Sequence, residues 1–193
     1  MVRAMWYVIQ VTSGQEHCTK ELIEKWITGE WIEQCFIPMR ERRIKYHGEW
    51  KLVQEKLFPG YVFIVTDFPE EVFQRLKTIT RLAKFLGNTD AGFIHLSEKE
   101  TDFICRFGDR NHVSHLSQVE IQEGSHVRIV SGDLLNYEGD IVRINLHKRI
   151  AVVRVEFMGS AVDLHLGIEI LRGGGRKDRM RMYLDKTNLD HNE

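Results

Sequence analysis

The chain has 193 residues, of which 42% are hydrophobic and 28% are charged, and its 27 basic and 28 acidic side chains leave a formal net charge of -1. This composition is typical of one or two folded domains, since 10% aromatic residues supply apolar surface for a core. Its apolar runs are far shorter than the roughly 20 residues that a membrane helix needs. The first of them is too short for a secretion signal, so we expect a cytoplasmic protein that does not span a membrane.

The first 108 residues alternate between strand-like and helical patterns. Helices are predicted to begin near Ser13, which forms a possible capping box with Glu16, at Pro69 and after Ser97. Strands are predicted over residues 5–11, 35–46, 49–57 and 61–66, with a short one near 83–86. Consecutive strands joined by tight turns pair antiparallel, so we predict an α+β fold in which three helices flank an antiparallel sheet.

The rest of the chain has a different pattern. Residues 109–117 are polar and lack periodicity, which is typical of a linker. Short strand-like runs punctuated by glycines then predict a small β-barrel. The predicted organisation is an N-terminal domain over residues 1–108, a linker over 109–117, a barrel over 118–172 and a basic tail without a fold over 173–193.

The sequence lacks the common motifs for catalysis and metal binding. The sequence contains no phosphate-binding loop, no Gly-x-Ser-x-Gly elbow and no His-Glu-x-x-His motif. It has no Cys-x-x-Cys pair, and the close pair His112 and His115 has no third ligand nearby. We therefore predict that the protein is not an enzyme, has no catalytic residues and binds no metal or cofactor.

Basic and aromatic residues gather on the predicted hairpin over residues 39–60. Cations attract phosphates and flat rings can stack on bases, so this element is a candidate nucleic-acid-binding site. The alternative is a solvated hairpin whose charges keep an exposed edge from aggregating. The candidate residues are Arg40, Arg42, Arg43, Lys45, Tyr46, Trp50, Lys51 and Lys56.

The strand that follows Gly60 is apolar on both faces. Tyr61 and Phe63 share one face, whereas Val62 and Ile64 share the other. One face can pack on helices. The other face either meets a second domain or a partner protein, or is covered within its own domain, and the pattern alone leaves these alternatives open.

Several motifs follow one another in a distinctive order. They are residues 6–10 (WYVIQ), 13–16 (SGQE), 57–63 (LFPGYVF), 84–87 (KFLG), 124–129 (GSHVRI), 139–144 (GDIVRI) and 155–159 (VEFMG). In this order they resemble the NusG family of transcription elongation factors, and the segments that begin at Gly124 and Gly139 resemble its KOW motif. A KOW motif also occurs in ribosomal proteins, but the combination is specific.

The resemblance implies an N-terminal domain that docks on the clamp helices of the large RNA polymerase subunit. It also implies a C-terminal SH3-like barrel that recruits another factor, such as a ribosomal protein or a termination factor, and we expect a monomer. Specialised relatives touch a second polymerase element through a polar triad, which residues 73–75 (FQR) do not match. The polymerase-binding surface of the family carries over onto Val8, Gln10, Phe58, Pro59, Tyr61 and Phe63.

The chain departs from a general elongation factor in its basic hairpin, in residues 134–137 (LLNY) and in its basic tail. These departures favour an operon-specific processive antiterminator that resembles the LoaP group, with the basic hairpin binding a nascent RNA hairpin or the non-template DNA strand. One alternative is a general elongation and termination factor of the same family. Another is a ribosome-associated KOW protein that binds RNA, although such a protein has no use for the Phe-Pro-Gly-Tyr surface.

Overall fold

The structure is a computed structural model that describes residues 5–27, 29–79, 93–122, 126–171 and 183–185. The chain divides into two compact units, each built from two separate segments. The first unit comprises Met1–Pro38 and Phe58–Cys105, and the second comprises Met39–Leu57 and Arg106–Glu193. Within the described residues, no helix is both long and apolar enough to cross a membrane.

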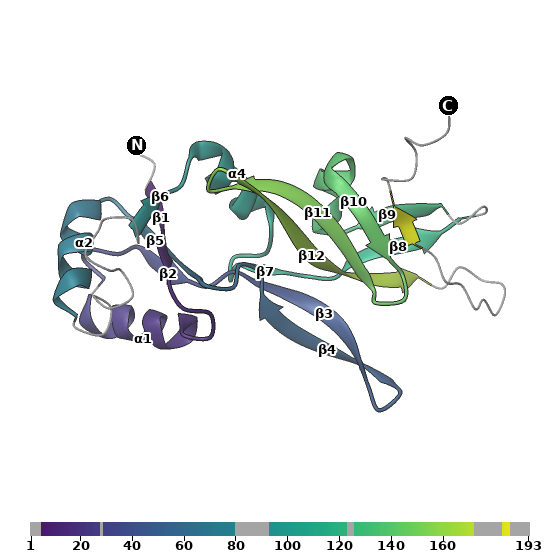
Figure 1. The fold of residues 1–193 in the computed structure, drawn as a ribbon, viewed down its shortest axis with the longest axis horizontal. Coiled ribbons are helices and arrows are strands. Elements are labelled where there is room, and N and C mark those ends of the chain that lie inside the picture. Colours follow the sequence, from purple (N-terminus) through teal and green to yellow (C-terminus); the bar gives the residue numbers. More distant parts are fainter. Residues whose placement is uncertain (1–4, 28, 80–92, 123–125, 172–182, 186–193) are drawn as a thin grey trace. The chain divides into compact units, whose positions relative to one another are not determined.

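The first unit contains a four-stranded antiparallel sheet (Figure 1). Its strands, in spatial order, are β2 (Gln34–Phe36), β5 (Tyr61–Thr66), β1 (Met5–Gln10) and β6 (Phe93–His95). The register of β1 and β5 places Val8 opposite Phe63 and Gln10 opposite Tyr61. Val8 and Gln10, which the resemblance assigns to the polymerase-binding surface, are therefore direct neighbours of Phe63 and Tyr61.

Within the described residues, three helices accompany this sheet, in the places where the sequence predicts them. They are α1 (Glu16–Trp26), α2 (Pro69–Thr78) and α4 (Glu98–Arg106). α2 packs on the sheet through Phe73, whose ring stacks 5.7 Å from that of Phe93, which in turn stacks 4.6 Å from Tyr7. At the start of α4, the Ser97 hydroxyl and backbone N–H both donate to Glu100, so the predicted capping box is present.

The start of α1 differs from the prediction. No side chain caps this helix from Gln15, and Glu16 is instead fully buried. One of its carboxylate oxygens accepts a hydrogen bond from the backbone N–H of Gly14 at 2.8 Å, and the other accepts one from Gly60 at 2.7 Å. Gly60 has a φ of 88°, which a residue with a side chain rarely adopts. Glu16 therefore joins the helix start to the turn before β5.

In the second unit, β3 (Met39–Tyr46) and β4 (Glu49–Lys56) form the predicted hairpin, with His47 and Gly48 at positive φ in its turn. The sequence predicted one strand over residues 35–46. The structure instead ends β2 at Phe36 and begins β3 at Met39, because Pro38 has no N–H with which to continue a ladder.

Residues 109–117, predicted as a linker, form hydrogen bonds among themselves and include a short strand that pairs with β3. The Asp109 carboxylate accepts hydrogen bonds from the backbone N–H groups of Asn111 and Val113. β7 (Val113–Ser114) pairs in parallel with β3, and Met39 donates its N–H to the carbonyl of His112. The hairpin thus groups with the C-terminal part of the chain rather than with the first sheet. Periodicity did not indicate this, because the segment is held by polar and backbone bonds.

A larger sheet completes the second unit. Its strands, in spatial order, are β13 (Tyr183–Asp185), β10 (Ile141–Asn145), β11 (Ile150–Phe157), β12 (Ser160–Leu171), β8 (Ser117–Ile121) and β9 (Val127–Ser131). β12 runs without a break from Ser160 to Leu171. A 3-10 segment, η3 (Asp133–Asp140), connects β9 to β10. The core of the sheet includes Val153, Leu164, Leu166 and Ile168, all at most 2% exposed.

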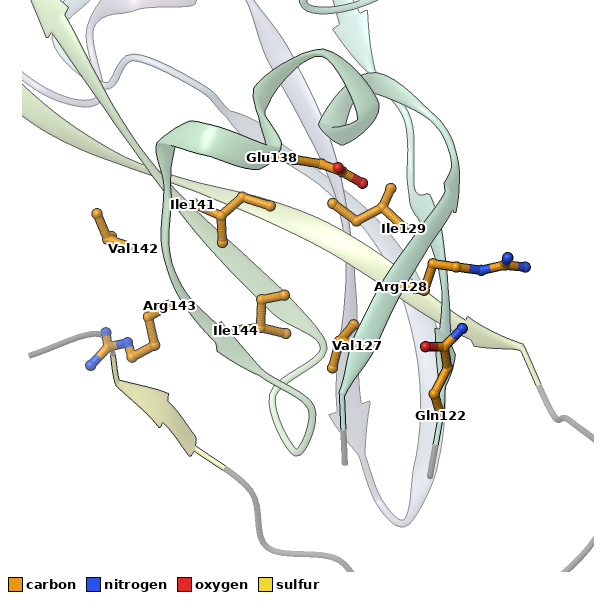
Figure 2. Close-up of a pocket in the computed structure, with 9 residues that line it drawn as sticks. All are labelled: Gln122, Val127, Arg128, Ile129, Glu138, Ile141, Val142, Arg143 and Ile144. Atoms are coloured by element: carbon orange, nitrogen blue, oxygen red, sulfur yellow. The ribbon is translucent and has the colours of Figure 1, made fainter. Parts of the chain in front are cut away.

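A cavity of about 440 Å³ lies between β9 and β10 (Figure 2). Ile129, Ile141 and Ile144 point into the space between the strands, whereas Arg128 and Arg143 point away from it. Within the described residues the strand order runs from β13 to β9 without joining its two ends, so the closed SH3-like barrel stays a prediction.

Some predictions fall on residues that the structure does not describe. They are the strand near 83–86 with its motif over 84–87, the first two residues of the motif over 124–129, and most of the basic tail. Within that tail, predicted to lack a fold, Tyr183–Asp185 forms β13 and pairs antiparallel with β10. The physical reason is that the edge of β10 presents unpaired backbone groups that a short strand can satisfy.

Candidate polymerase and nucleic-acid interfaces

The apolar face assigned to polymerase binding is covered at its centre. Val8 and Phe63 are 0% exposed and Phe58 is 3% exposed. The Phe63 ring lies 5.5 Å from that of Phe36 and 5.7 Å from that of Phe58, so the three rings form one cluster. The resemblance predicts that polymerase contacts Phe58 and Phe63 directly. In the structure both rings are buried, because neighbouring aromatic rings pack against them.

The surface of this region is formed by the remaining three residues of the assignment. Gln10 and Pro59 are exposed and Tyr61 is half-buried. Because Gln10 and Tyr61 are paired across β1 and β5, their side chains lie next to each other. A partner that approaches this edge would touch these three residues before it reached the aromatic cluster.

On the hairpin, Arg40 and Arg42 share one carboxylate. The guanidinium groups of Arg40 and Arg42 lie 3.1 and 2.9 Å from the same oxygen of Glu55. Partial burial alone would raise the pKa of Glu55, but hydrogen bonds from Arg42 and Arg40 outweigh it and hold that pKa below its ordinary value. Two of the predicted phosphate-binding cations are thus engaged within the hairpin itself.

Arg43 and Trp50 are engaged by the larger sheet. Arg43 donates from Nε to Glu169 at 2.6 Å, and the guanidinium of Arg149 lies 4.3 Å over the Trp50 ring. The sequence had assigned both hairpin residues to nucleic acid and had singled out neither Glu169 nor Arg149. No local pattern could have found this contact, since Arg43 and Glu169 are 126 residues apart.

The tip of the hairpin presents the accessible part of the cluster. Tyr46 is 54% exposed, and Lys51 holds its ammonium group 4.7 Å over the Tyr46 ring. Lys45 and Lys51 are exposed, whereas Lys56, at the base of the hairpin, is half-buried. We call Lys45, Tyr46 and Lys51 the hairpin tip.

Arg143 on β10 is a further cation of the larger sheet, and sequence reasoning missed it. The register pairs Arg143 with Val152 and Val152 with His165, so Arg143 and His165 share one face. Burial, followed by the positive charges of Arg40, Arg42 and Arg143, lowers the pKa of His165. His165 is therefore neutral at pH 7.

His115 provides a test of how residues 109–117 meet the hairpin. Its imidazole lies 3.2 Å from Glu41 and 3.4 Å from Asp109, and the hydrogen bond to Glu41 is the main cause that raises its pKa above 6.5. A raised folded-state pKa means that this contact stabilises the fold fully below the unfolded-state pKa and loses that effect as the pH rises through the folded-state pKa. We expect an NMR titration to show a raised pKa that falls in Glu41→Gln. An unshifted His115 would contradict the contact.

Comparisons with known proteins agree on one family. The NusG family model, described as transcription termination factor nusG, matches residues 4–105. The transcription termination/antitermination protein NusG of Haemophilus influenzae is 26% identical over 165 residues, which cover 83% of this chain and 89% of that protein. The protein of the same name from Thermus thermophilus is 29% identical over 177 residues, which cover 83% and 94%.

A solved structure entitled "Domain interaction in Thermotoga maritima NusG" is also similar, with 20% identity, coverage of 86% of this chain and 94% of that one, and a TM-score of 0.47. The family model and the named relatives define the class of protein as a transcription factor. Because the family model spans more than half of its residues, the chain belongs to the NusG family.

Proposed function

We propose that this NusG-family protein is an operon-specific processive antiterminator that acts in the cytoplasm and resembles the LoaP group. The observation that carries the proposal is the hairpin tip, where the ring of Tyr46 is exposed with Lys51 over it and the neighbouring Lys45 is also exposed. A general elongation factor has no need for a sequence-selective contact of this kind. The proposed ligand is a hairpin in the nascent RNA of the regulated operon, because an RNA loop offers unstacked bases beside closely spaced phosphates.

The proposed docking site on RNA polymerase is the clamp helices of the large subunit. Gln10, Pro59 and Tyr61 would make the contact, since they are the accessible members of the assigned set. Val8, Phe58 and Phe63 are buried, so they would not touch the polymerase but would support the shape of this edge. Half-buried tyrosines are well suited to protein interfaces, because the ring supplies apolar area and the hydroxyl a hydrogen bond.

At the hairpin tip, Tyr46 would stack on a base and Lys45 and Lys51 would bind phosphates. Arg40 and Arg42 are paired with Glu55, so their role would be to stiffen the hairpin rather than to contact RNA. The remaining part of the proposal concerns the KOW segment. It would recruit a further factor, such as a ribosomal protein or a termination factor.

A second candidate is a general NusG elongation and termination factor. It is favoured by the names of the relatives, which are transcription termination/antitermination proteins. Under this function the hairpin would contact the non-template DNA strand through charge. The two candidates therefore differ in whether the hairpin tip distinguishes one RNA from another.

Replacing Tyr46 with alanine tests the proposed function. We expect Tyr46→Ala to weaken binding of leader RNA from the operon beside the gene by about tenfold, since a base stacked on an aromatic ring contributes roughly 1–3 kcal/mol. Trp26→Ala is a matched control, because Trp26 is also exposed and has Lys25 over its ring at 5.5 Å, but lies on α1. Gel shifts with leader RNA, a scrambled RNA of equal length and single-stranded DNA at one salt concentration would provide the measurement.

The three ligands separate the candidate functions. Selective binding of leader RNA that is lost in Tyr46→Ala supports the antiterminator. Preferential binding of single-stranded DNA favours the general factor. Equal affinity of the unaltered protein for all three would show that the tip acts through charge alone, and operon-specific recognition by this element would then be wrong.

A further inference from the structure

One carboxylate on the larger sheet holds two arginines from different elements. An oxygen of Glu169 on β12 accepts a hydrogen bond from Arg43 of β3 at 2.6 Å. Its other oxygen accepts one from Nη1 of Arg149, in the turn between β10 and β11, at 2.9 Å. All three side chains are at least two-thirds shielded from solvent, which strengthens the attraction relative to a fully exposed pair. Glu169 thus ties the hairpin to two parts of the larger sheet.

Arg149 also contacts the hairpin directly. The Arg149 guanidinium stacks 4.3 Å over the ring of Trp50 on β4. Trp50 is paired across the hairpin with Lys45, a member of the hairpin tip. We call Arg43, Glu169, Arg149 and Trp50 the Glu169 network. It contacts both strands of the hairpin, so it restrains rotation of the hairpin as well as its distance from β12.

The backbone is also adapted to this contact. A Cβ atom at Gly167 would overlap the carbonyl oxygen of Glu41, so β3 can cross β12 closely only because Gly167 has no side chain. Gly167 is two residues from Glu169 and therefore on the same face of β12. The crossing point and the Glu169 network lie side by side on one strand.

We propose that Glu169 and Arg149 are positioning residues, which hold the hairpin at a fixed orientation on the larger sheet so that its tip is presented to RNA already ordered. This inference rests on the proposed function for the RNA-binding step only. A two-stranded hairpin is marginally stable by itself, and a mobile hairpin loses conformational freedom when it binds. Arg43 and Trp50 are then anchors of the hairpin and not contacts to nucleic acid.

Glu169 is acidic, so the two explanations of its role predict opposite effects of removing its charge. If charge alone governed binding, removing the negative charge of Glu169 would strengthen attraction to RNA. If Glu169 positions the hairpin, its removal weakens binding instead. The sign of the effect therefore separates the two explanations.

The test uses the full chain with Glu169→Gln, and Glu156→Gln as the matched control. Glu156 is exposed on β11 and gives the same change in charge. We expect Glu169→Gln to weaken leader-RNA binding by about tenfold, the usual effect of losing a hydrogen bond between charged groups, while Glu156→Gln binds as before or slightly more tightly. Arg149→Lys keeps the charge but loses the planar stacking group, and it should also weaken binding.

Hydrogen–deuterium exchange provides a readout that does not depend on RNA. Amides of β3 and β4 should exchange about tenfold faster in Glu169→Gln, while those of β11 stay protected. Adding Arg43→Ala to Glu169→Gln should cause little further loss of RNA binding, because both changes break one contact.

The outcomes are separable. Unchanged exchange in the hairpin overturns the positioning role. Faster exchange with unchanged or tighter RNA binding shows that the network holds the hairpin but overturns its contribution to recognition. If the unaltered protein binds no RNA, the proposed function fails, and the exchange measurement alone decides whether Glu169 positions the hairpin.

Discussion

Replacing Phe63 with alanine is expected to lower the free energy of unfolding of the first unit by about 4 kcal/mol. The ring is fully buried on β5, and its loss leaves a cavity beside Phe36 and Phe58. Chemical denaturation followed by tryptophan fluorescence would measure the change, because Trp6 lies edge-on to Phe36 at 5.4 Å in the same cluster. A loss below about 1 kcal/mol would show that this ring is not buried.

Tyr61→Ala is the matched variant for polymerase binding. Tyr61 lies two residues before Phe63 on the same face but is only half-buried. We expect it to cost about 1 kcal/mol or less in stability and to weaken co-purification with polymerase by about tenfold. If Tyr61→Ala binds polymerase normally, the docking surface lies elsewhere. Phe63→Ala by itself cannot decide this question, because a destabilised unit also binds less.

Replacing Glu16 with alanine is expected to cost about 3 kcal/mol, since it removes the acceptor for two backbone N–H groups and leaves that of Gly60 buried without this partner. The cost arises because a buried donor has given up its hydrogen bond to water. Thermal unfolding followed by circular dichroism would measure it. The effect should appear at the turn before β5 as well as in α1.

Glu21→Ala is the control for Glu16→Ala. Glu21 lies on the same helix but is exposed, so its replacement should change stability by less than about 0.5 kcal/mol. Equal effects of the two substitutions would mean that losing any carboxylate from α1, and not the bond to Gly60 in particular, explains the loss. Amide exchange at Gly60 would distinguish these causes directly.

Sequence patterns predicted the local elements well. The hairpin follows from alternating strand residues around His47 and Gly48, and the start of α4 from Ser97 and Glu100. Each signal lies within a few residues of the structure that it specifies, because caps and tight turns are set by local hydrogen bonds. The neighbourhood of Tyr61 and Gln10 followed from side-chain alternation together with the family resemblance.

Contacts between distant residues could not be predicted in the same way. Glu169 is an ordinary acidic residue on a strand until the fold brings Arg43 beside it. Burial of Phe63 likewise depends on Phe36, which lies 27 residues earlier on β2. Residues 109–117 looked like a linker because their contacts use Asp109 and the backbone rather than an apolar face. Polar and long-range contacts leave no periodic signal.

The division of the hairpin from the first sheet affects how the protein is made. The hairpin, residues 39–57, leaves the ribosome well before β7 and β12, which it contacts in the second unit. Until residues 113–169 are synthesised, one edge of β3 lacks the partner strand that it has in the finished fold, and such an edge is prone to pair with another chain. A fragment that ends at residue 108 would keep this condition permanently. The arginines of β3 would then protect the nascent chain from aggregation, before Arg43 meets Glu169.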